Sequence, residues 1–201
     1  MARMTTHSVE EHPMSDPSLR CTDAGSTSER RAPGRVHVYT GEGKGKTSAA
    51  MGLALRALGH RRRVFIGQFM KTGSSGEVAA LDAFGLARVE GYGHDGWLFG
   101  EPTSEHQRRA RAGFARSIDA LTGGRYDIVI LDEIDVALAF GLLTIDDCLL
   151  LLDRRPHEVE LVFTGRSAPP EITARADLVT EMREVKHYYH QGVDARPGIE
   201  Y

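Results

Sequence analysis

Residues 36–49 read Val-His-Val-Tyr-Thr-Gly-Glu-Gly-Lys-Gly-Lys-Thr-Ser-Ala, and this stretch decides the fold. A short β-type run leads into a loop rich in glycine and lysine, and then into a helix-forming segment. The three glycines allow the backbone to curl so that successive N–H groups point at one anion. The helix that follows adds its positive end. The stretch therefore predicts a phosphate-binding loop of the P-loop type, and with it a nucleotide ligand.

The loop departs from the usual pattern G-x4-G-K-[ST] at one position. Gly45, Lys46 and Thr47 fit the pattern, but Thr40 stands where the first glycine is expected. The alternative is an ordinary glycine-rich turn between a strand and a helix. Two lysines that flank Gly45, directly after a strand, disfavour that alternative. The predicted nucleotide ligands are Thr40, Gly41, Glu42, Gly43, Lys44, Gly45, Lys46, Thr47 and Ser48.

Length and composition restrict the class of protein. The 201 residues, 41% of them hydrophobic, predict one domain with an appendage, which we place at residues 35–201 and 1–34. The polar segment 1–34 is expected to be disordered alone, or to become ordered over a bound ligand. A net charge of -3 disfavours nucleic-acid binding. No apolar run is long enough to span a membrane, and the separated Cys21 and Cys148 suit the reducing cytoplasm.

From residue 35 onward, strand and helix patterns alternate. Strands are expected at 36–40, 64–69, 87–90, 127–131, 159–164 and 178–180, and helices at 46–58, 75–84, 103–121, 135–140, 144–152 and 169–176. This alternation predicts an α/β fold of the P-loop NTPase type, with a mainly parallel sheet and helices on both faces. Ligands of such sheets bind beyond the carboxyl ends of the strands. Residues 40–48, 68–71, 132–133 and 165–166 all follow strand ends, so we expect them to converge.

Two acids follow the most apolar strand. Ile-Val-Ile-Leu at 128–131 precedes Asp132 and Glu133, which is the Walker B pattern. A carboxylate there can hold Mg²⁺ opposite the hydroxyl of Thr47. The alternative role for Asp132 is to cap the next helix, and the sequence leaves open which acid contacts the metal.

Other polar residues at strand ends have two interpretations each. Lys71 contacts phosphate or is simply solvated. Arg166 grips a phosphate bidentately or forms a surface salt bridge. The cluster at 187–190, His-Tyr-Tyr-His, indicates packing or ligand contact rather than a metal site, since no third ligand accompanies it.

Five segments together resemble one family, the P-loop ATP:corrinoid adenosyltransferases. They are residues 40–50, 64–71, 130–133, 163–169 and 176–201. The stretch 176–187 and the closing Gly-Ile-Glu-Tyr at 198–201 are the most specific, because generic P-loop hydrolases do not end in this way. The family also tolerates threonine at position 40.

The resemblance implies chemistry at carbon rather than at phosphorus. A Co(I) corrinoid attacks the 5′ carbon of ATP, and triphosphate leaves. Lys44, Lys46 and Mg²⁺ would neutralise the leaving group, Lys46 and Glu133 would be the catalytic residues, and Thr47, Asp132 and Glu133 would hold the metal. The resemblance also implies a homodimer and a flavoprotein reductant.

The loop at 91–99 is where the chain departs from well-known members. Those members carry Gly-Phe-Thr-Trp, whose aromatic rings help to remove the lower axial ligand of the corrinoid. Here the loop reads Gly-Tyr-Gly-His-Asp-Gly-Trp-Leu-Phe. Trp97 corresponds with a shift of one residue, whereas the phenylalanine has no counterpart. We expect Tyr92, His94 and Trp97 to contact the corrinoid, whose identity the sequence leaves open.

Two other functions remain as alternatives to the adenosyltransferase. One is a P-loop ATPase or kinase that uses the same cradle. The other is a nucleotide-dependent module that binds a corrinoid without chemistry. The C-terminal match favours the adenosyltransferase over the ATPase.

Overall fold

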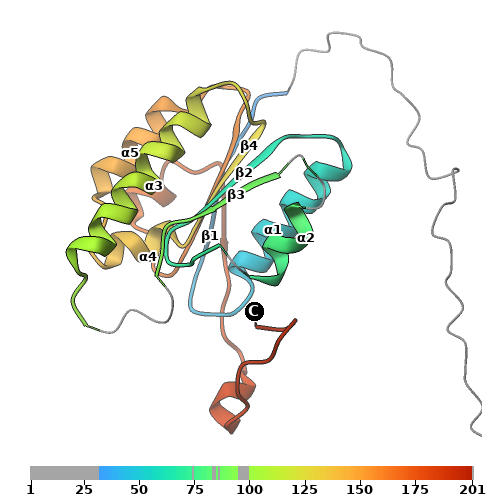
Figure 1. The fold of residues 1–201 in the computed structure, drawn as a ribbon, viewed down its shortest axis with the longest axis vertical. Helices are drawn as coiled ribbons and strands as arrows, with labels where there is room; N and C mark the ends of the chain where they lie inside the picture. Colours follow the sequence, from blue (N-terminus) through green and yellow to red (C-terminus); the bar gives the residue numbers. More distant parts are fainter. Residues whose placement is uncertain (1–31, 74, 83–84, 86, 95–99, 201) are drawn as a thin grey trace, which may run out of the picture. The chain divides into compact units, whose positions relative to one another are not determined.

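A six-stranded, wholly parallel sheet forms the centre of the protein (Figure 1), in the order β3-β2-β4-β5-β1-β6. The computed structural model describes residues 32–73, 75–82, 85, 87–94 and 100–200, so residues 1–31 of the expected tail lie outside the described residues. The strands are β1 (Val36–Thr40), β2 (Val64–Gln68), β3 (Ala87–Gly91), β4 (Ile128–Asp132), β5 (Glu160–Thr164) and β6 (Leu178–Glu181).

Helices cover both faces of this sheet, which confirms the predicted α/β class. On one face, α1 (Lys46–Gly59) and α2 (Gly76–Asp82) enclose one apolar core. The opposite face packs against a second core, which receives side chains from the remaining four helices. These are α3 (Ser104–Thr122), α4 (Ile134–Ala139), α5 (Ile145–Arg154) and α6 (Pro170–Thr173). No helix in the described part of the chain has the length and apolar character needed to cross a membrane.

Strands β2 and β4 are apolar up to their last residue, and both faces of the sheet are covered there. Every residue of β2 and β4 is buried. In β1 only Val36 and Val38 are buried, and in β6 every residue is exposed. A buried polar side chain in these two strands therefore indicates a special role. There are two among the residues of β2 and β4, Gln68 and Asp132, and each is the last residue of its strand.

Helix ends differ in a way that bears on function. Complete capping boxes close the N-termini of α3 and α5, where Thr103 pairs with His106 and Thr144 with Asp147. By contrast, α1 begins after Gly45 with no side-chain cap and no acid in its first turn. The first N–H groups of α1 are thereby left for a ligand.

Observed boundaries differ from the predicted ones by a few residues. Gly59 is the last residue of α1, whose C-cap is His60, and α6 is limited to four residues that begin at Pro170. Helix α2 begins at Gly76, one residue later than predicted, and residues 83–84 lie outside the described set. The short 3-10 helix η2 (Tyr188–Gln191) was not expected, because its sequence carries no helical periodicity.

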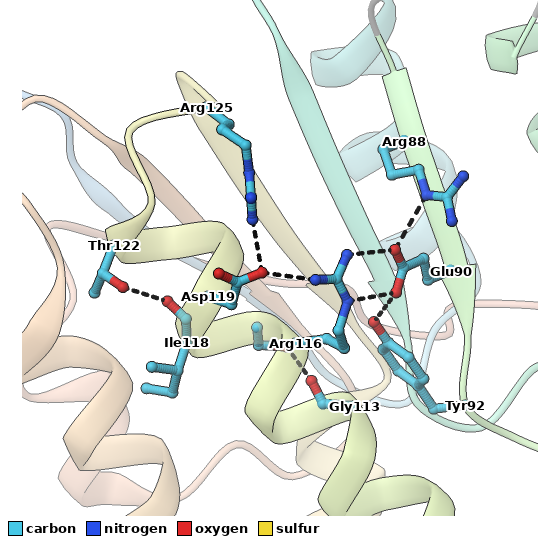
Figure 2. Close-up of polar contacts among 10 residues, drawn as sticks. Arg88, Glu90, Tyr92, Gly113, Arg116, Ile118, Asp119, Thr122 and Arg125 are labelled. Carbon is cyan, nitrogen blue, oxygen red and sulfur yellow. Dashed lines mark hydrogen bonds and ion pairs between the residues drawn. The ribbon is translucent and has the colours of Figure 1, made fainter.

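A polar cluster ties α3 to the edge strand β3 (Figure 2). The carboxylate of Glu90 accepts hydrogen bonds from Arg116 at 2.8 and 3.1 Å, from Arg88 at 3.1 Å and from the Tyr92 hydroxyl at 2.9 Å. The Tyr92 ring packs against α3 at Gly113, where an added Cβ would lie 2.4 Å from the ring. The end of β3 and the residue that follows it are therefore fixed against α3.

Candidate functional site: a phosphate cradle at the carboxyl ends of the strands

The glycine-rich loop joins β1 to α1 and curls as the sequence predicts. Gly41 has φ +99 and Gly45 has φ +122, conformations that favour glycine. Gly41 also lies against the backbone of the C-terminal segment, where a Cβ would stand 2.4 Å from the carbonyl oxygen of Met182. The N–H of Gly43 donates to that same oxygen at 2.7 Å. The segment that follows β6 thus supports the outer side of the loop.

Thr40 ends β1 in ordinary strand geometry, in register with Glu181 of β6. Its hydroxyl accepts a hydrogen bond from the N–H of Ala168 at 3.0 Å. The position therefore needs no glycine, and its side chain ties the P-loop to the turn after β5.

Lys46 lies with its ammonium inside the loop. The Nζ atom donates to the carbonyl oxygens of Gly41, at 2.6 Å, and Gly43, at 2.9 Å. The residue is only 7% exposed, and burial lowers the pKa of its ammonium. A cation held by weak neutral acceptors in a desolvated loop gains strongly from an incoming anion.

Asp132 is the centre of the site. It is fully buried at the end of β4, and its carboxylate accepts four hydrogen bonds from three segments: the start of α1, residues 68–71 at the end of β2, and the end of β5. Oδ1 accepts from the hydroxyls of Thr47 (2.9 Å) and Thr164 (2.7 Å), and Oδ2 accepts from Gln68 Nε2 (3.1 Å) and Lys71 Nζ (2.9 Å). The predicted convergence of strand ends is therefore observed. The carboxylate does not cap α4, whose N-cap is Glu133.

Glu133 occupies a strained position beside this centre. Its backbone is left-handed, with φ 60, which is uncommon for a residue with a side chain. Its N–H donates to Thr164 Oγ1 at 3.0 Å. Burial, and then the charge of Asp132, raise the pKa of the Glu133 carboxyl, while Lys71 and Lys46 oppose that rise.

Lys44, the other lysine of the loop, points to the C-terminal segment. Its Nζ donates to Glu200 Oε1 at 2.8 Å, to the carbonyl oxygen of Ile199 at 3.0 Å and to the Tyr188 hydroxyl at 3.1 Å. The Tyr188 hydroxyl also bonds Glu200, and the Arg196 guanidinium lies 4.9 Å from the Tyr188 ring centre. Lys44 thus holds the end of the chain against the loop.

The remaining predicted nucleotide ligands lie at the rim. Arg166, in the turn after β5, pairs with Glu42 of the loop at 3.1 Å, and both side chains are more than half exposed. Such a surface pair contributes little stability, so the guanidinium is available to a ligand. Ser48 is exposed on the first turn of α1.

The three residues expected to contact the corrinoid are placed differently from one another. Tyr92 is 9% exposed and packs in the core, with its ring 5.6 Å from that of Phe69. His94 is exposed, and its ring lies 5.0 Å from that of His106. Trp97 lies outside the described residues.

Several residues at the site were not assigned from sequence. Gln68 and Thr164 carry no motif of their own, and Glu200 belongs to the closing Gly-Ile-Glu-Tyr at 198–201 without an assigned role. The sequence does contain a signal for Gln68 and Thr164, since each is a polar residue at the end of an apolar strand and so stands where ligands bind. Lys71 was assigned to solvent or to phosphate, and the structure instead pairs it with Asp132.

Comparison with known proteins assigns the domain at residues 32–201 to a family. Residues 32–201 match the family model described as ATP:corrinoid adenosyltransferase BtuR/CobO/CobP. The chain is 37% identical over 172 residues to a corrinoid adenosyltransferase of Pseudomonas aeruginosa, covering 84% of each chain. It is 36% identical to that of Escherichia coli K12 (84% of this chain, 86% of the relative) and 34% identical to the corrinoid adenosyltransferase CobA of Salmonella typhimurium (89% and 91%).

A solved structure supports the fold alone. The flagellar accessory protein FlaH of Methanocaldococcus jannaschii superposes with a TM-score of 0.52 at 14% identity, covering 75% of this chain and 72% of that one. The family match spans the P-loop, the acids after β4 and the C-terminal segment, and the chain belongs to the ATP:corrinoid adenosyltransferase family.

Proposed function

We propose that this protein transfers the 5′-deoxyadenosyl group of ATP to the Co(I) centre of a corrinoid and releases triphosphate. The observation that carries the proposal is the convergence of Lys46, the uncapped start of α1 and the Thr47–Asp132 pair in a chain of this family. In this reaction the Co(I) electron pair forms the Co–C bond. The C5′–O bond breaks, and its electrons leave with the triphosphate.

The described residues fit Mg²⁺. Thr47 and Asp132 offer a hydroxyl and a carboxylate 2.9 Å apart, which are the hard oxygen ligands that Mg²⁺ prefers, and Glu133 stands next to them. No group of three or more His, Cys, Asp or Glu side chains suited to a metal occurs in the described part of the chain. Mg²⁺ at nucleotide sites is commonly bound by one or two carboxylates, with substrate phosphate oxygens completing its coordination. When bound, Mg²⁺ would stabilise charge on the leaving triphosphate.

The chain itself supplies binding and orientation. The N–H groups at the start of α1 and the ammonium of Lys46 hold the triphosphate, and Arg166 reaches it from the rim. Co(I) is a strong nucleophile, so the reaction needs no general base. Alignment of cobalt with C5′ and exclusion of water remain the tasks of the protein.

The corrinoid is proposed to approach over the loop at 91–99. His94, which is exposed, and Trp97 are proposed to contact it, and Tyr92 would hold the start of this segment in place through its contacts with Phe69 and Glu90. We further propose that the protein is cytoplasmic, acts as a homodimer and receives Co(I) from a flavoprotein reductant.

Identification of the phosphate product tests the reaction. The protein is incubated with ATP, Mg²⁺ and a chemically reduced corrinoid. Intact triphosphate and a photolabile Co–C product are expected, whereas diphosphate or phosphate would contradict the proposal. Lys46→Ala should lose the activity, and Arg154→Met, at the end of α5, should retain it.

The two alternatives predict other outcomes. An ATPase or kinase would release phosphate or transfer it without a corrinoid. A corrinoid-binding module would bind both ligands and turn over neither. The family match along residues 32–201, which includes the C-terminal segment, favours the adenosyltransferase.

A further inference from the structure

Lys71 lies between the two groups that would ligate the metal. Its Nζ donates to Thr47 Oγ1 at 3.0 Å and to Asp132 Oδ2 at 2.9 Å. Thr47 in turn donates its hydroxyl proton to Asp132 Oδ1 at 2.9 Å. A positive charge supplied by the chain therefore already contacts the hydroxyl and the carboxylate that suit Mg²⁺.

The carboxylate of Asp132 has no acceptor capacity to spare. Two oxygens offer about four lone-pair sites, and four donors use them. A metal that enters this site must displace one of the donors. Gln68 and Thr164 are fully buried and fixed at strand ends, whereas the Lys71 side chain is 33% exposed on a long flexible stem. Lys71 is the donor that can leave.

Displacement is unfavourable unless Lys71 acquires a new partner. Without nucleotide, a divalent ion would have to expel an ammonium from a fully buried carboxylate and also give up its own water. With triphosphate in the adjacent cradle, the ion gains phosphate ligands and the released ammonium gains phosphate oxygens. The two ligands should then bind with positive coupling.

We propose that Lys71 is an internal cation that keeps divalent metal out of the Thr47–Asp132 site until a triphosphate binds, and that its ammonium then moves to the triphosphate. The inference rests on the proposed function, because it concerns the same nucleotide site. It makes Lys71 a positioning residue, which orders the binding of metal and nucleotide.

Mn²⁺ titration followed by electron paramagnetic resonance tests the proposal without any turnover. Wild-type protein should bind Mn²⁺ weakly alone and at least about tenfold more tightly with inorganic triphosphate, within the usual range of coupling between sites. Lys71→Met should bind Mn²⁺ alone about tenfold or more tightly than the wild type, and should lose most of the coupling. Equal Mn²⁺ affinity of the two proteins without triphosphate would overturn the proposal.

Two controls keep the result interpretable. Arg154→Met removes one positive charge far from the site and should leave Mn²⁺ binding unchanged. Lys71→Arg keeps a cation and should exclude Mn²⁺ better than Lys71→Met, even if the methionine variant is less stable. If Mn²⁺ binds none of the proteins even with triphosphate, both the metal site and this gating are wrong. Adenosylation by the wild type is measured separately and reports on the proposed function alone.

Discussion

Asp135 is a buried carboxyl with an unusual environment. It is 1% exposed, and neither oxygen has a hydrogen-bond partner among the described residues. The turn at Gly165 lies directly against it, where an added Cβ would stand 2.5 Å from the Asp135 Cβ. Burial, and then the charge of Glu133, raise the pKa of the carboxyl to about 7. Between about pH 4 and pH 7, the Asp135 carboxyl is therefore protonated in the folded protein and ionised in the unfolded chain.

This difference predicts a pH-dependent effect of Asp135→Asn. Because the acid has the higher pKa in the folded state, the wild type loses stability as the pH rises from about 4 to about 7. At pH 8 the variant should be more stable than the wild type by about 1–3 kcal/mol, and near pH 4 this advantage should vanish. Urea unfolding of the wild type and the variant at pH 4 and pH 8 measures the difference in their free energies of unfolding. An advantage that is the same at pH 4 and pH 8 would show that the carboxyl is not protonated in the fold.

The sequence predicts the roles of residues that stand in known motifs, but it does not predict the roles of the residues that hydrogen-bond to them. Lys46, Thr47 and Asp132 stand at motif positions, since phosphate and metal chemistry demands those residue types in that order. Gln68 belongs to the segment 68–71 that is expected at the site, but the sequence assigns no role to it or to Thr164, because an amide or hydroxyl at the end of a strand has many structural uses. Their role became visible only through the strand order, which places β2 and β5 on either side of β4.

At the scale of elements, the Glu90 cluster joins α3 to an edge strand that is otherwise half-exposed. The hydrogen bonds from Arg116, more than the other contacts, hold the pKa of Glu90 at about 2. A carboxyl with a depressed pKa contributes stability above its ordinary pKa near 4.5, and that contribution is lost as the pH falls toward 2.

Glu90→Gln should therefore destabilise the protein most above pH 5. We expect a loss of about 1–2 kcal/mol at pH 6, a figure reduced for the solvent exposure of Arg116, and a much smaller difference near pH 2.5. Denaturant unfolding at both pH values measures it. Glu158→Gln, on an exposed turn, serves as the matched control and should show little difference at either pH.

The C-terminal segment and the P-loop should behave as one unit. Glu200→Gln removes the charge that pairs with Lys44 and Arg196, so residues 184–200 should become more sensitive to protease and exchange amide hydrogen faster. Lys44→Met should have the same effect, and the double variant should be no worse than either single one. Additive effects of the two substitutions would mean that Lys44 and Glu200 act separately.

Elements with a clear hydrophobic period were predicted to within a few residues, and the C-terminal segment was not. Strands β2 and β4 and helices α3 and α5 carry long apolar patterns or capping residues. Residues 182–200 have neither, and they are held by contacts with a distant part of the chain, such as those of Tyr188 and Glu200 with Lys44. Tertiary contacts of this kind leave no local signal in the sequence.

At the scale of the whole molecule, the site depends on strand order. Gln68 and Asp132 are in register between β2 and β4, and Leu131 is in register with Phe163 just before Thr164. The alternating pattern predicts a parallel sheet but does not specify which strands are neighbours. The order β3-β2-β4-β5-β1-β6 is what brings the four donors to one carboxylate.

Ligand binding should therefore stabilise the molecule as a unit. ATP with Mg²⁺ at about one hundred times its Kd should add about 2.7 kcal/mol to the free energy of unfolding. For a chain of this size that corresponds to a rise in Tm of roughly 5–11 °C. Triphosphate alone should give most of the rise, and adenosine alone little, because the proposed nucleotide ligands among the described residues are groups that bind phosphate. A thermal shift assay measures all three, and Lys46→Ala should abolish the effect.

Thr40 has a consequence for how such proteins are found. The first glycine of the usual pattern is dispensable here because position 40 keeps strand geometry, and the need for left-handed backbone falls on Gly41 and Gly45. A genome search that demands glycine five positions before Gly45 would pass over this chain. A search keyed to Gly41, Gly45, Lys46 and Thr47, with any residue allowed at position 40, would retrieve it and others that share its loop.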